Sequence, residues 1–354
     1  MHPIQLALHF GLAMALASSL AAQTTTVSVP CDLDNTLYED LTGSLSNGRG
    51  SGTFCGLTGT GRIRRAVMRF DVASVVPAGA WILSAKLDLF VEQSSAGTPA
   101  PASAYRLSQD WGEGSSAALG NGGGGAVATP GDATWIHTFY SGSTWTTPGG
   151  SFAGTPSFTM TLPTFGAASS DLSLQTAADV ASWLGSPSSN FGWLIKLDDE
   201  VTPSTARRLA SRENGFNNPS LEVTYLMPGQ VGTYGVSCSA ASSGFTETYV
   251  GVPTGGNTVQ IVQTNAPANS FGYNVLAFTI EPAGVSLAPG CTAYLPLGAI
   301  IIANLFPTDP FGSASTPFPL PIGFPGALIA AQSIVADGSP FGYAVSNAAV
   351  MVLQ

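Results

Sequence analysis

The stretch from Arg64 to Glu92 constrains the fold most, because its apolar and polar side chains alternate with a period of two. Between residues 81 and 92 every odd position is apolar, and the polar residues fall on even positions. Residues 66–72 show the same alternation, and Pro77 and Gly79 separate the two segments. This period is that of a strand with one buried face. The sequence therefore predicts two strands that contribute to one core.

Composition favours β structure in the rest of the chain. Only 9% of the 354 residues are charged, whereas glycine (42) and proline (25) are abundant, a balance typical of strands joined by many turns. One segment, residues 174–184, has helical spacing and is followed by Gly185, which suits a helix end. Further strands are predicted at residues 24–30, 102–107, 134–140, 191–197, 206–212 and 221–225.

The character of the chain changes after residue 226. All eleven lysine and arginine residues lie between Arg49 and Arg212, and short apolar runs separated by Pro and Gly follow from residue 232. We therefore expect an all-β protein with two sandwiches. The expected parts are a signal peptide at 1–22, a jelly-roll-like β-sandwich at 23–226, a linker at 227–233 and a smaller β-sandwich at 234–354.

The first 22 residues carry the features of an export signal. Residues 4–22 are apolar and end in small side chains, as a secretory signal peptide does, so we expect a secreted protein located outside the cell or at its surface. A retained anchor is the alternative, because ~20 apolar residues can span a bilayer. No later segment is long enough, so no membrane span is expected after cleavage. The net charge of −10 and the lack of a basic stripe argue against nucleic-acid binding.

Four cysteines, at positions 31, 55, 238 and 291, permit three pairings. The first two fall in one predicted domain and the last two in the other. We therefore expect disulfides Cys31–Cys55 and Cys238–Cys291, which would fit an oxidising compartment.

Several short motifs occur in the order of a known family. They are Val67-Met-Arg-Phe-Asp, Ile82-Leu-Ser-Ala-Lys-Leu-Asp-Leu, Asp110-Trp-Gly-Glu, Thr134-Trp, Asn190-Phe-Gly-Trp, Ala210-Ser-Arg-Glu and Asn218-Pro-Ser-Leu-Glu-Val-Thr-Tyr. Residues 26–226 thereby resemble the DNRLRE-domain family, which is similar to carbohydrate-binding module family 96. The resemblance implies a jelly-roll sandwich of secreted or surface proteins, some of them attached to polysaccharide lyases acting on alginate.

Two features depart from the family pattern. The motif that names the family remains only as Ser211-Arg212-Glu213, and a glycine-rich insertion occupies residues 120–130. We expect this insertion to be too flexible to carry chemistry on its own. The C-terminal part resembles the β modules that end many large secreted bacterial proteins, which implies no activity.

A ligand surface is expected on the polar side of the central strands. Arg65, Arg69 and Lys86 should point outward, and guanidinium forks suit carboxylate or sulfate groups of an acidic sugar. The alternative is a solvated face with cross-strand ion pairs, such as Lys86 with Asp71 or Asp88. The remaining candidates are three arginines expected on the same sheet face and one ring that could stack on a sugar: Arg106, Arg208, Arg212 and Trp111.

Other chemistry has weaker candidates. His137 is the one histidine beyond the signal peptide, which excludes a zinc site of several histidines, and we interpret it as packed on a strand. Asp110, Glu113 and Asp132 could supply the carboxylate pair of a glycosidase, although capping of turns is the interpretation we prefer.

Structural calcium is possible in this chain, and no other cofactor is expected. Hard oxygen ligands of the kind that calcium prefers occur in two groups, with solvated turns as the alternative. The groups are Asp32, Asp34, Glu39 and Asp40, and Asp198-Asp199-Glu200.

The sequence thus predicts a secreted, non-catalytic protein that binds acidic, uronate-type polysaccharide through its first domain. One alternative is a structural or adhesive cell-surface protein without a defined sugar ligand. A polysaccharide lyase or hydrolase is the third possibility.

Overall fold

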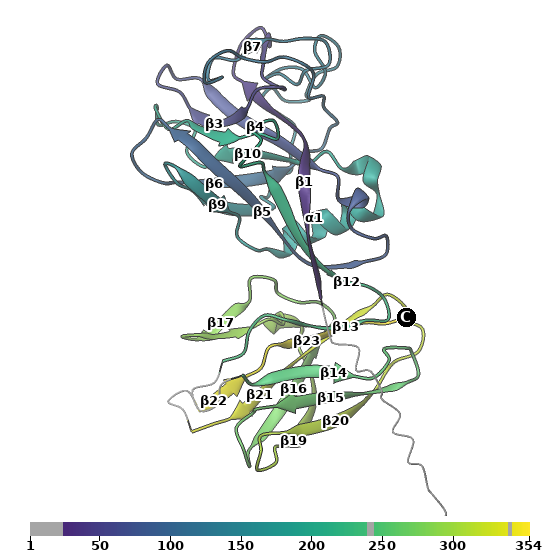
Figure 1. Ribbon diagram of the computed structural model, residues 1–354. Coiled ribbons are helices and arrows are strands. Elements are labelled where there is room, and N and C mark those ends of the chain that lie inside the picture. The colour runs from purple at the N-terminus through teal and green to yellow at the C-terminus, as the bar shows by residue number, and fades with distance from the viewer. Residues whose placement is uncertain (1–23, 239–243, 339–341) are drawn as a thin grey trace, which may run out of the picture.

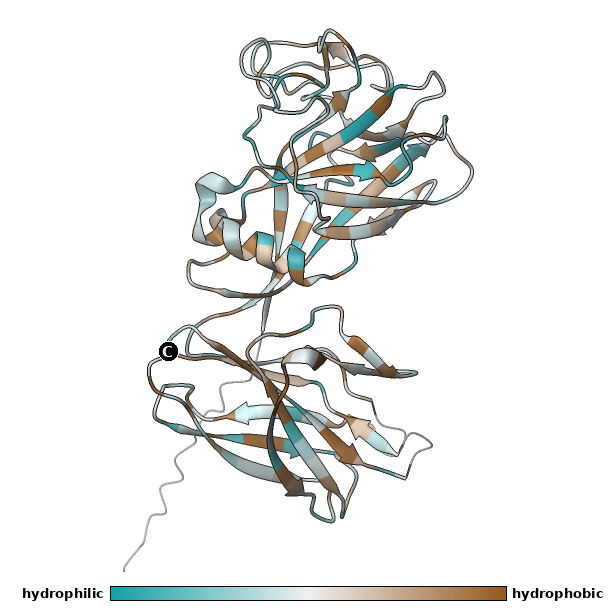
Figure 2. Cartoon of the chain, turned by 180° about the vertical axis from the view of Figure 1, so that it is seen from behind, coloured by the Kyte–Doolittle hydropathy of each residue, from teal (hydrophilic) through white to brown (hydrophobic). Residues whose placement is uncertain are grey.

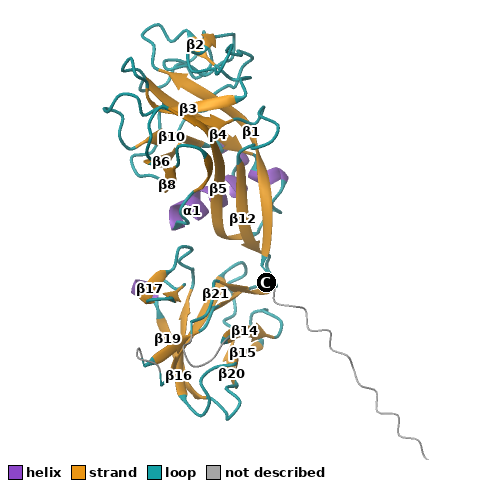
Figure 3. Ribbon diagram, turned by 60° about the vertical axis from the view of Figure 1, so that its left-hand side comes forward, coloured by secondary structure: helices purple, strands orange, loops and turns teal. Residues whose placement is uncertain are grey.

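The computed structural model describes residues 24–238, 244–338 and 342–354, so the expected signal peptide at 1–22 lies outside the described residues. Two β domains follow one another along the chain (Figure 1). Strands are the main regular secondary structure of both domains, and α1 (Leu174–Gly185) is the one α-helix in the described part (Figure 3). The predicted all-β class is confirmed. Three short 3-10 helices are η1 (Val72–Ser74), η2 (Pro187–Ser189) and η3 (Leu297–Ala299).

The first domain is built on one ten-stranded sheet that folds into two layers. Residues 25–30 of β1 pair with β12, whereas residues 31–38 pair with β4, so β1 belongs to both layers. β3 connects β11 with β4 in the same way. The strands are β1 (Thr25–Tyr38), β3 (Gly52–Leu57), β4 (Ile63–Phe70), β5 (Trp81–Ser94), β6 (Ala100–Arg106), β8 (Phe158–Leu162), β9 (Gly166–Ser169), β10 (Trp193–Leu197), β11 (Arg207–Ala210) and β12 (Ser220–Leu226).

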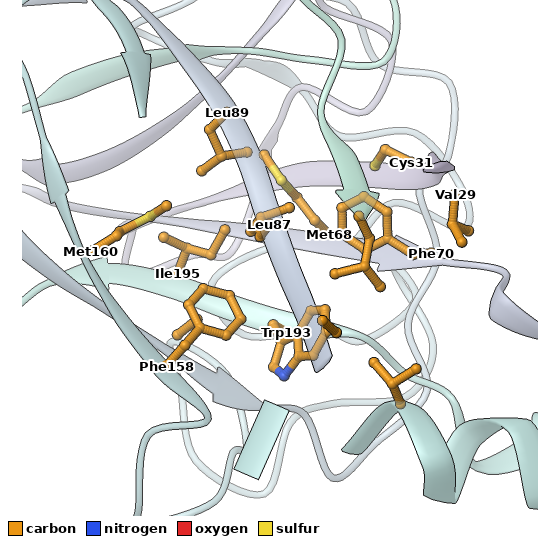
Figure 4. Close-up of a cluster of buried hydrophobic side chains, with 14 of the residues drawn as sticks. Val29, Cys31, Met68, Phe70, Leu87, Leu89, Phe158, Met160, Trp193 and Ile195 are labelled. Carbon is orange, nitrogen blue, oxygen red and sulfur yellow. The ribbon is translucent and has the colours of Figure 1, made fainter. Parts of the chain in front are cut away.

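The core of this domain lies between the two layers. Leu87 and Leu89 of β5 belong to one buried cluster with Met68 and Phe70 of β4 and Trp193 of β10 (Figure 4). Apolar and polar bands alternate along the strands (Figure 2). The alternation predicted from the sequence is therefore confirmed for both strands, and it places Arg65 and Arg69 of β4 and the charged side chains of β5 away from this core.

The opposite face of β4 is covered as well. Val67 lies in a second buried cluster with Leu37 and Leu194, and the long connection between β6 and β8 contributes Trp111 and Trp145 to it. Much of this connection is irregular, and the small sheet of β2 (Leu45–Ser46) and β7 (Ala126–Val127) lies within the same loop region. The side of β4 that the sequence predicts to be wet is therefore largely packed against loops.

The prediction of a strand at residues 134–140 is wrong, because this segment forms a turn. The hydroxyl of Thr134 accepts hydrogen bonds from the backbone N–H groups of Ile136 and His137, which folds the segment into a turn. His137 is half-buried, and its Nδ1 lies 3.1 Å from the Thr134 hydroxyl. The histidine is packed, as expected, although it does not lie on a strand.

The predicted helix is confirmed. α1 begins after Ser173, whose side chain accepts a hydrogen bond from the Thr176 N–H, as an N-cap does. Val180 and Trp183 of α1 join the core cluster of the first domain. The helix thus closes one end of the sandwich.

The second domain is a smaller sandwich. Its layers meet at a buried cluster that includes Ile261, Ala331 and Met351. The six-stranded sheet contains β13 (Val231–Tyr234), β16 (Phe271–Ala277), β19 (Ile301–Pro307), β21 (Leu328–Ala336), β22 (Tyr343–Val345) and β23 (Ala348–Val352). The other strands are β14 (Thr246–Val250), β15 (Thr258–Thr264), β20 (Ala314–Pro319), β17 (Val285–Ala288) and β18 (Cys291–Ala293).

The connection between the domains is short. β12 ends at Leu226 and β13 begins at Val231, inside the segment expected to be a linker. Leu83 and Leu226 of the first domain lie in one buried cluster with Ile280 and Val350 of the second. The two sandwiches therefore share apolar contacts. Among the described residues, no helix has the length and apolar character needed to cross a bilayer.

Only one of the two expected disulfides is present. Cys238 and Cys291 are bonded, as predicted, whereas Cys31 and Cys55 are free and buried, so that pairing is wrong. Cys31 pairs with Phe70 at one end of β4, and the neighbour of Cys55, Gly56, pairs with Arg64 at the other end. That length of strand spans about 20 Å, whereas a disulfide requires Cα atoms within about 7 Å.

Candidate functional site

The cations predicted to form one binding surface lie on different faces. Arg65 and Arg69 project from β4, in one layer of the first domain, whereas Lys86 projects from β5, in the other layer. Arg208 lies on β11, beside β5. The prediction that these side chains point away from the core is confirmed. The prediction that they share one sheet face is wrong.

The other two arginines are also elsewhere. Arg106 of β6 pairs directly with Trp193, which points into the core, so Arg106 points toward α1 and not outward. There its Nη1 lies 3.6 Å from Asp179 and its Nη2 donates to the Ser182 hydroxyl. Arg212 follows the end of β11 in a turn.

Every one of these cations is held by a carboxylate of the chain itself. The guanidinium of Arg65 makes two hydrogen bonds of 2.8 Å to Glu200, and Arg69 donates two to Asp32 at 2.9 and 2.6 Å. Ion pairing within the chain, the alternative to a ligand surface, is therefore the better description of these cations. The remaining ion pairs are Lys86 with Asp88 and Glu222, Arg106 with Asp179, Arg208 with Glu92, and Arg212 with Glu113 and Glu213.

Trp111 cannot stack on a sugar ring in this structure. It is 2% exposed, and its Nε1 donates to the carbonyl of Phe191. The three carboxylates considered for a glycosidase also have internal partners. Asp110 accepts from the N–H of Trp111, buried Asp132 accepts from the N–H of Thr129, and Glu113 is bound through both oxygens by Arg212.

A different part of the first domain brings arginines to an open cavity. The cavity has a volume of about 130 Å³ and lies between β3, β4, β5, β11 and the glycine-rich loop. Its lining includes Phe54, Arg64, Gln93, Asn121, Arg207 and Arg208. We call this the arginine cavity. Of its three arginines, only Arg208 was a candidate from the sequence.

Two of these arginines lack a counter-charge. Within residues 24–238, 244–338 and 342–354, neither Arg64 nor Arg207 forms an ion pair with a carboxylate. Arg64 donates to the carbonyls of Ile63 and Gly123, and Arg207 donates to those of Thr205 and Thr98. The Nε atoms of both are buried without a hydrogen-bond partner. Burial lowers the pKa of both guanidinium groups, because it disfavours the charged form.

The glycine-rich loop is an ordered wall of the cavity, contrary to the expectation of flexibility. The hydroxyl of Tyr38 donates to the carbonyl of Gly122 at 2.8 Å. Arg208 Nε donates to the carbonyl of Asn121 at 3.0 Å. Arg64 also donates to the carbonyl of Gly123. All three bonds are accepted by backbone carbonyls of the glycine-rich loop.

The charge of the cavity suits an anion. Three arginine residues line it, and of these only Arg208 forms an ion pair among the described residues, with Glu92. A buried charge without a partner is costly, so an anion that enters the cavity would offset that cost. Carboxylate and sulfate groups match the fork of a guanidinium, and the side-chain amides of Gln93 and Asn121 can hydrogen-bond to hydroxyl groups.

The two groups given as possible calcium ligands are dispersed. Asp32 binds Arg69, and Asp40 accepts hydrogen bonds from Thr42 and Ser44. Glu39 accepts from the N–H of Ile63. The second group is divided too, since Asp198 accepts from Ser103, Asp199 from the N–H groups of Val201 and Thr202, and Glu200 from Arg65. The first group is separated because neighbouring residues of a strand point to opposite sides. The second is separated because Asp199 caps the N–H groups of a turn.

Asp34 alone among them joins a carboxylate cluster. Oxygens of Asp34, Glu113 and Glu213 lie within 4.8 Å of one another. Burial raises the pKa of Asp34 to about 8 and also raises that of Glu213, to which the nearby Glu113 adds. We call these three residues the carboxylate cluster. Arg212, next to Glu213, binds both Glu113 and Glu213.

The sequence contains a signal for the residues that were missed. Arg64 has the parity of Ala66, Met68 and Phe70, so the alternation that predicts the core also predicts an inward arginine. Arg207 has the parity of Leu209 in the same way. An arginine at a core-facing position is unusual and could have identified the cavity. No comparable sequence signal predicts that Asp34 lies close to Glu113 and Glu213, because the conformation of the loops determines these distances.

No protein-family model and no curated protein matches this chain.

Proposed function

We propose that the protein is secreted and binds acidic polysaccharide without catalysing a reaction, and that the arginine cavity receives the carboxylate of a uronate residue. The observation that carries this proposal is the pair Arg64 and Arg207, two buried arginines that line an open cavity and form no ion pair with a carboxylate of the described residues. The protein loses stability by keeping such groups unpaired. An anionic ligand gives a physical reason for their presence.

Two further features support the proposal. The disulfide Cys238–Cys291 suits an oxidising, extracytoplasmic compartment. The two-layer sheet of residues 25–226 is compatible with the resemblance to the DNRLRE-domain and carbohydrate-binding module 96 families. The ligand class follows from the chemistry of the cavity, which differs from the flat cationic face expected from the sequence.

A structural or adhesive role without a sugar ligand is the second candidate. It is favoured by the six predicted surface cations, each of which is held by a carboxylate of the same chain. Such a surface is rigid and has little charge left to attract a polyanion. The two candidates differ in one measurable property, the affinity of the arginine cavity for uronates.

The double variant Glu92→Gln/Arg208→Gln tests the proposal by titration calorimetry with uronate oligosaccharides. It removes one guanidinium fork from the cavity and leaves the net charge of the protein unchanged. We expect the affinity to fall ten- to hundredfold, since a hydrogen bond to a charged group contributes about 1.5–3 kcal/mol and 1.4 kcal/mol corresponds to tenfold.

Arg62→Gln is the matched control. Arg62 is exposed in the turn before β4 and does not line the cavity, so the variant removes a positive charge and keeps the fork. We expect its affinity to change less than threefold. An equal loss in both variants would contradict a specific role of the Arg208 fork, and an absence of binding to any uronate by the unaltered protein would favour the structural role.

A further inference from the structure

We propose that the carboxylate cluster of Asp34, Glu113 and Glu213 binds one calcium ion, which would fix the loops of the first domain to the end of its sandwich. This inference concerns a different site from the arginine cavity and does not depend on a sugar ligand. It differs from the calcium groups expected from the sequence, because two of its three ligands come from other parts of the chain.

The spacing of the cluster suits calcium. Calcium–oxygen bonds are about 2.4 Å long, so two ligands on opposite sides of the ion are about 4.8 Å apart. The ligand oxygens of the cluster all lie within 4.8 Å of one another. These distances are therefore within the reach of a single ion that contacts all three carboxylates.

Two oxygens in the cluster have no partner. Asp34 is 0% exposed, and its Oδ1 is buried without a hydrogen bond, although its Oδ2 accepts from the N–H of Arg212. Oε2 of Glu213 is also buried and unpartnered. Buried oxygens of this kind are nearly always satisfied in folded proteins. Both unpartnered oxygens belong to the same cluster, so one cation would supply the missing partner of each.

The charge of the cluster is also incomplete. Three carboxylates face Arg212 and, at 3.7 Å from Glu113, Arg49. Arg49 is 52% exposed, so solvent screens much of its charge. When Asp34 is ionised, the three carboxylates therefore outweigh the two cations around them. A carboxylate offers about four lone-pair sites, so Glu113 can bind Arg212 and still coordinate an ion.

The ligands are held in place by their neighbours. The N–H of Asp34 donates to Glu113 Oε1 at 3.1 Å, and Asn35 Nδ2 donates to the carbonyl of Glu113 at 3.0 Å. The N–H of Glu213 donates to the hydroxyl of Ser211. Asp34 lies on β1, whereas Glu113 and Glu213 lie in loops. An ion bound here would join a strand to two loops that are distant in sequence.

Equilibrium dialysis of the full chain with calcium chloride tests the inference directly. We expect one calcium ion per chain, and a loss of affinity of at least tenfold in each of Asp34→Asn and Glu213→Gln. Both changes keep the shape of the side chain and an acceptor oxygen, so the hydrogen bond from the Arg212 N–H can persist. Asp71→Asn is the matched control, because Asp71 is exposed and does not belong to the cluster, and its affinity should be unchanged.

Thermal unfolding supplies a second readout that does not depend on the dialysis. Calcium at a hundredfold excess over its dissociation constant should raise the midpoint of the first domain by about 5–10 °C, and EDTA should reverse the rise. Neither effect should occur in Asp34→Asn. Absence of calcium binding by the unaltered protein, or equal binding by Asp34→Asn and Glu213→Gln, would overturn the inference and leave the sugar proposal unaffected.

Discussion

Replacing Trp193 with alanine is expected to lower the free energy of unfolding of the first domain by about 4 kcal/mol, in the range found for buried aromatic residues. The side chain is fully buried, and its ring centre lies 4.5 Å from that of Trp183 and 5.2 Å from that of Phe158. Its Nε1 also donates to Asp179, a buried carboxylate. The substitution therefore creates a cavity and takes a donor from a buried charge.

Calorimetric unfolding measures this effect. A loss of about 4 kcal/mol in a domain of this size corresponds to a fall of roughly 10–15 °C in the midpoint. Phe216→Ala is the control, because Phe216 is 95% exposed and its removal should change the midpoint by less than 2 °C. A fall of less than 3 °C for Trp193→Ala would show that this cluster is not the main core of the domain.

The second domain is expected to lose stability as the pH rises from about 4.5 to 7. Glu247 is fully buried, and burial raises its pKa from 4.5 to about 7. Between these two values the folded state binds more protons than the unfolded state, so the stability given by the proton is complete below pH 4.5 and lost by pH 7. The loss is on the order of 3 kcal/mol.

Glu247→Gln should remove this pH dependence. The amide stays neutral, and it can donate a hydrogen bond near Gln263 and Tyr249, both of which have a buried unpartnered oxygen. We therefore expect the variant to be more stable than the unaltered protein at pH 8 and similar to it at pH 4.5. Glu281→Gln, a half-buried glutamate of the same domain, is the control. Parallel stability curves for the unaltered protein and Glu247→Gln would contradict this explanation.

The core could be predicted from the sequence, because strand parity is a local property. The alternation at residues 81–92 places Leu87 and Leu89 in the core, and the structure has both there. The helix at residues 174–184 follows from spacing and a terminal glycine in the same way. These features require no knowledge of which segments meet.

The ligand surface could not be predicted, since parity says where a side chain points and not what covers it. The residues between β6 and β8 have no regular pattern, yet they pack over Val67. Glu200 is distant in sequence from Arg65, and only the folded chain shows that the two bind. The expected disulfide Cys31–Cys55 failed for the same reason, because closeness in sequence does not give closeness across a sheet.

The two sites of the first domain illustrate this difference. Arg64 and Arg207 follow from an irregularity in the alternation, a charge at a core-facing position, and are accessible to sequence reasoning. The carboxylate cluster combines β1 with two loops, so its three members are far apart in the chain. Their proximity depends on how the loops fold over the end of the sandwich.

The affinity of Arg64→Met for uronate oligosaccharides tests the central claim most directly. Methionine keeps an apolar stem and lacks the guanidinium. Because Arg64 pairs with no carboxylate of the described residues, removing its charge should not destabilise the fold. Arg62→Met, the same change at the neighbouring exposed position, controls for the loss of charge. We predict that Arg64→Met binds uronates at least tenfold more weakly than Arg62→Met while the first domain unfolds at an equal or higher temperature. Equal affinities in the two variants would contradict the assignment of the arginine cavity as the binding site.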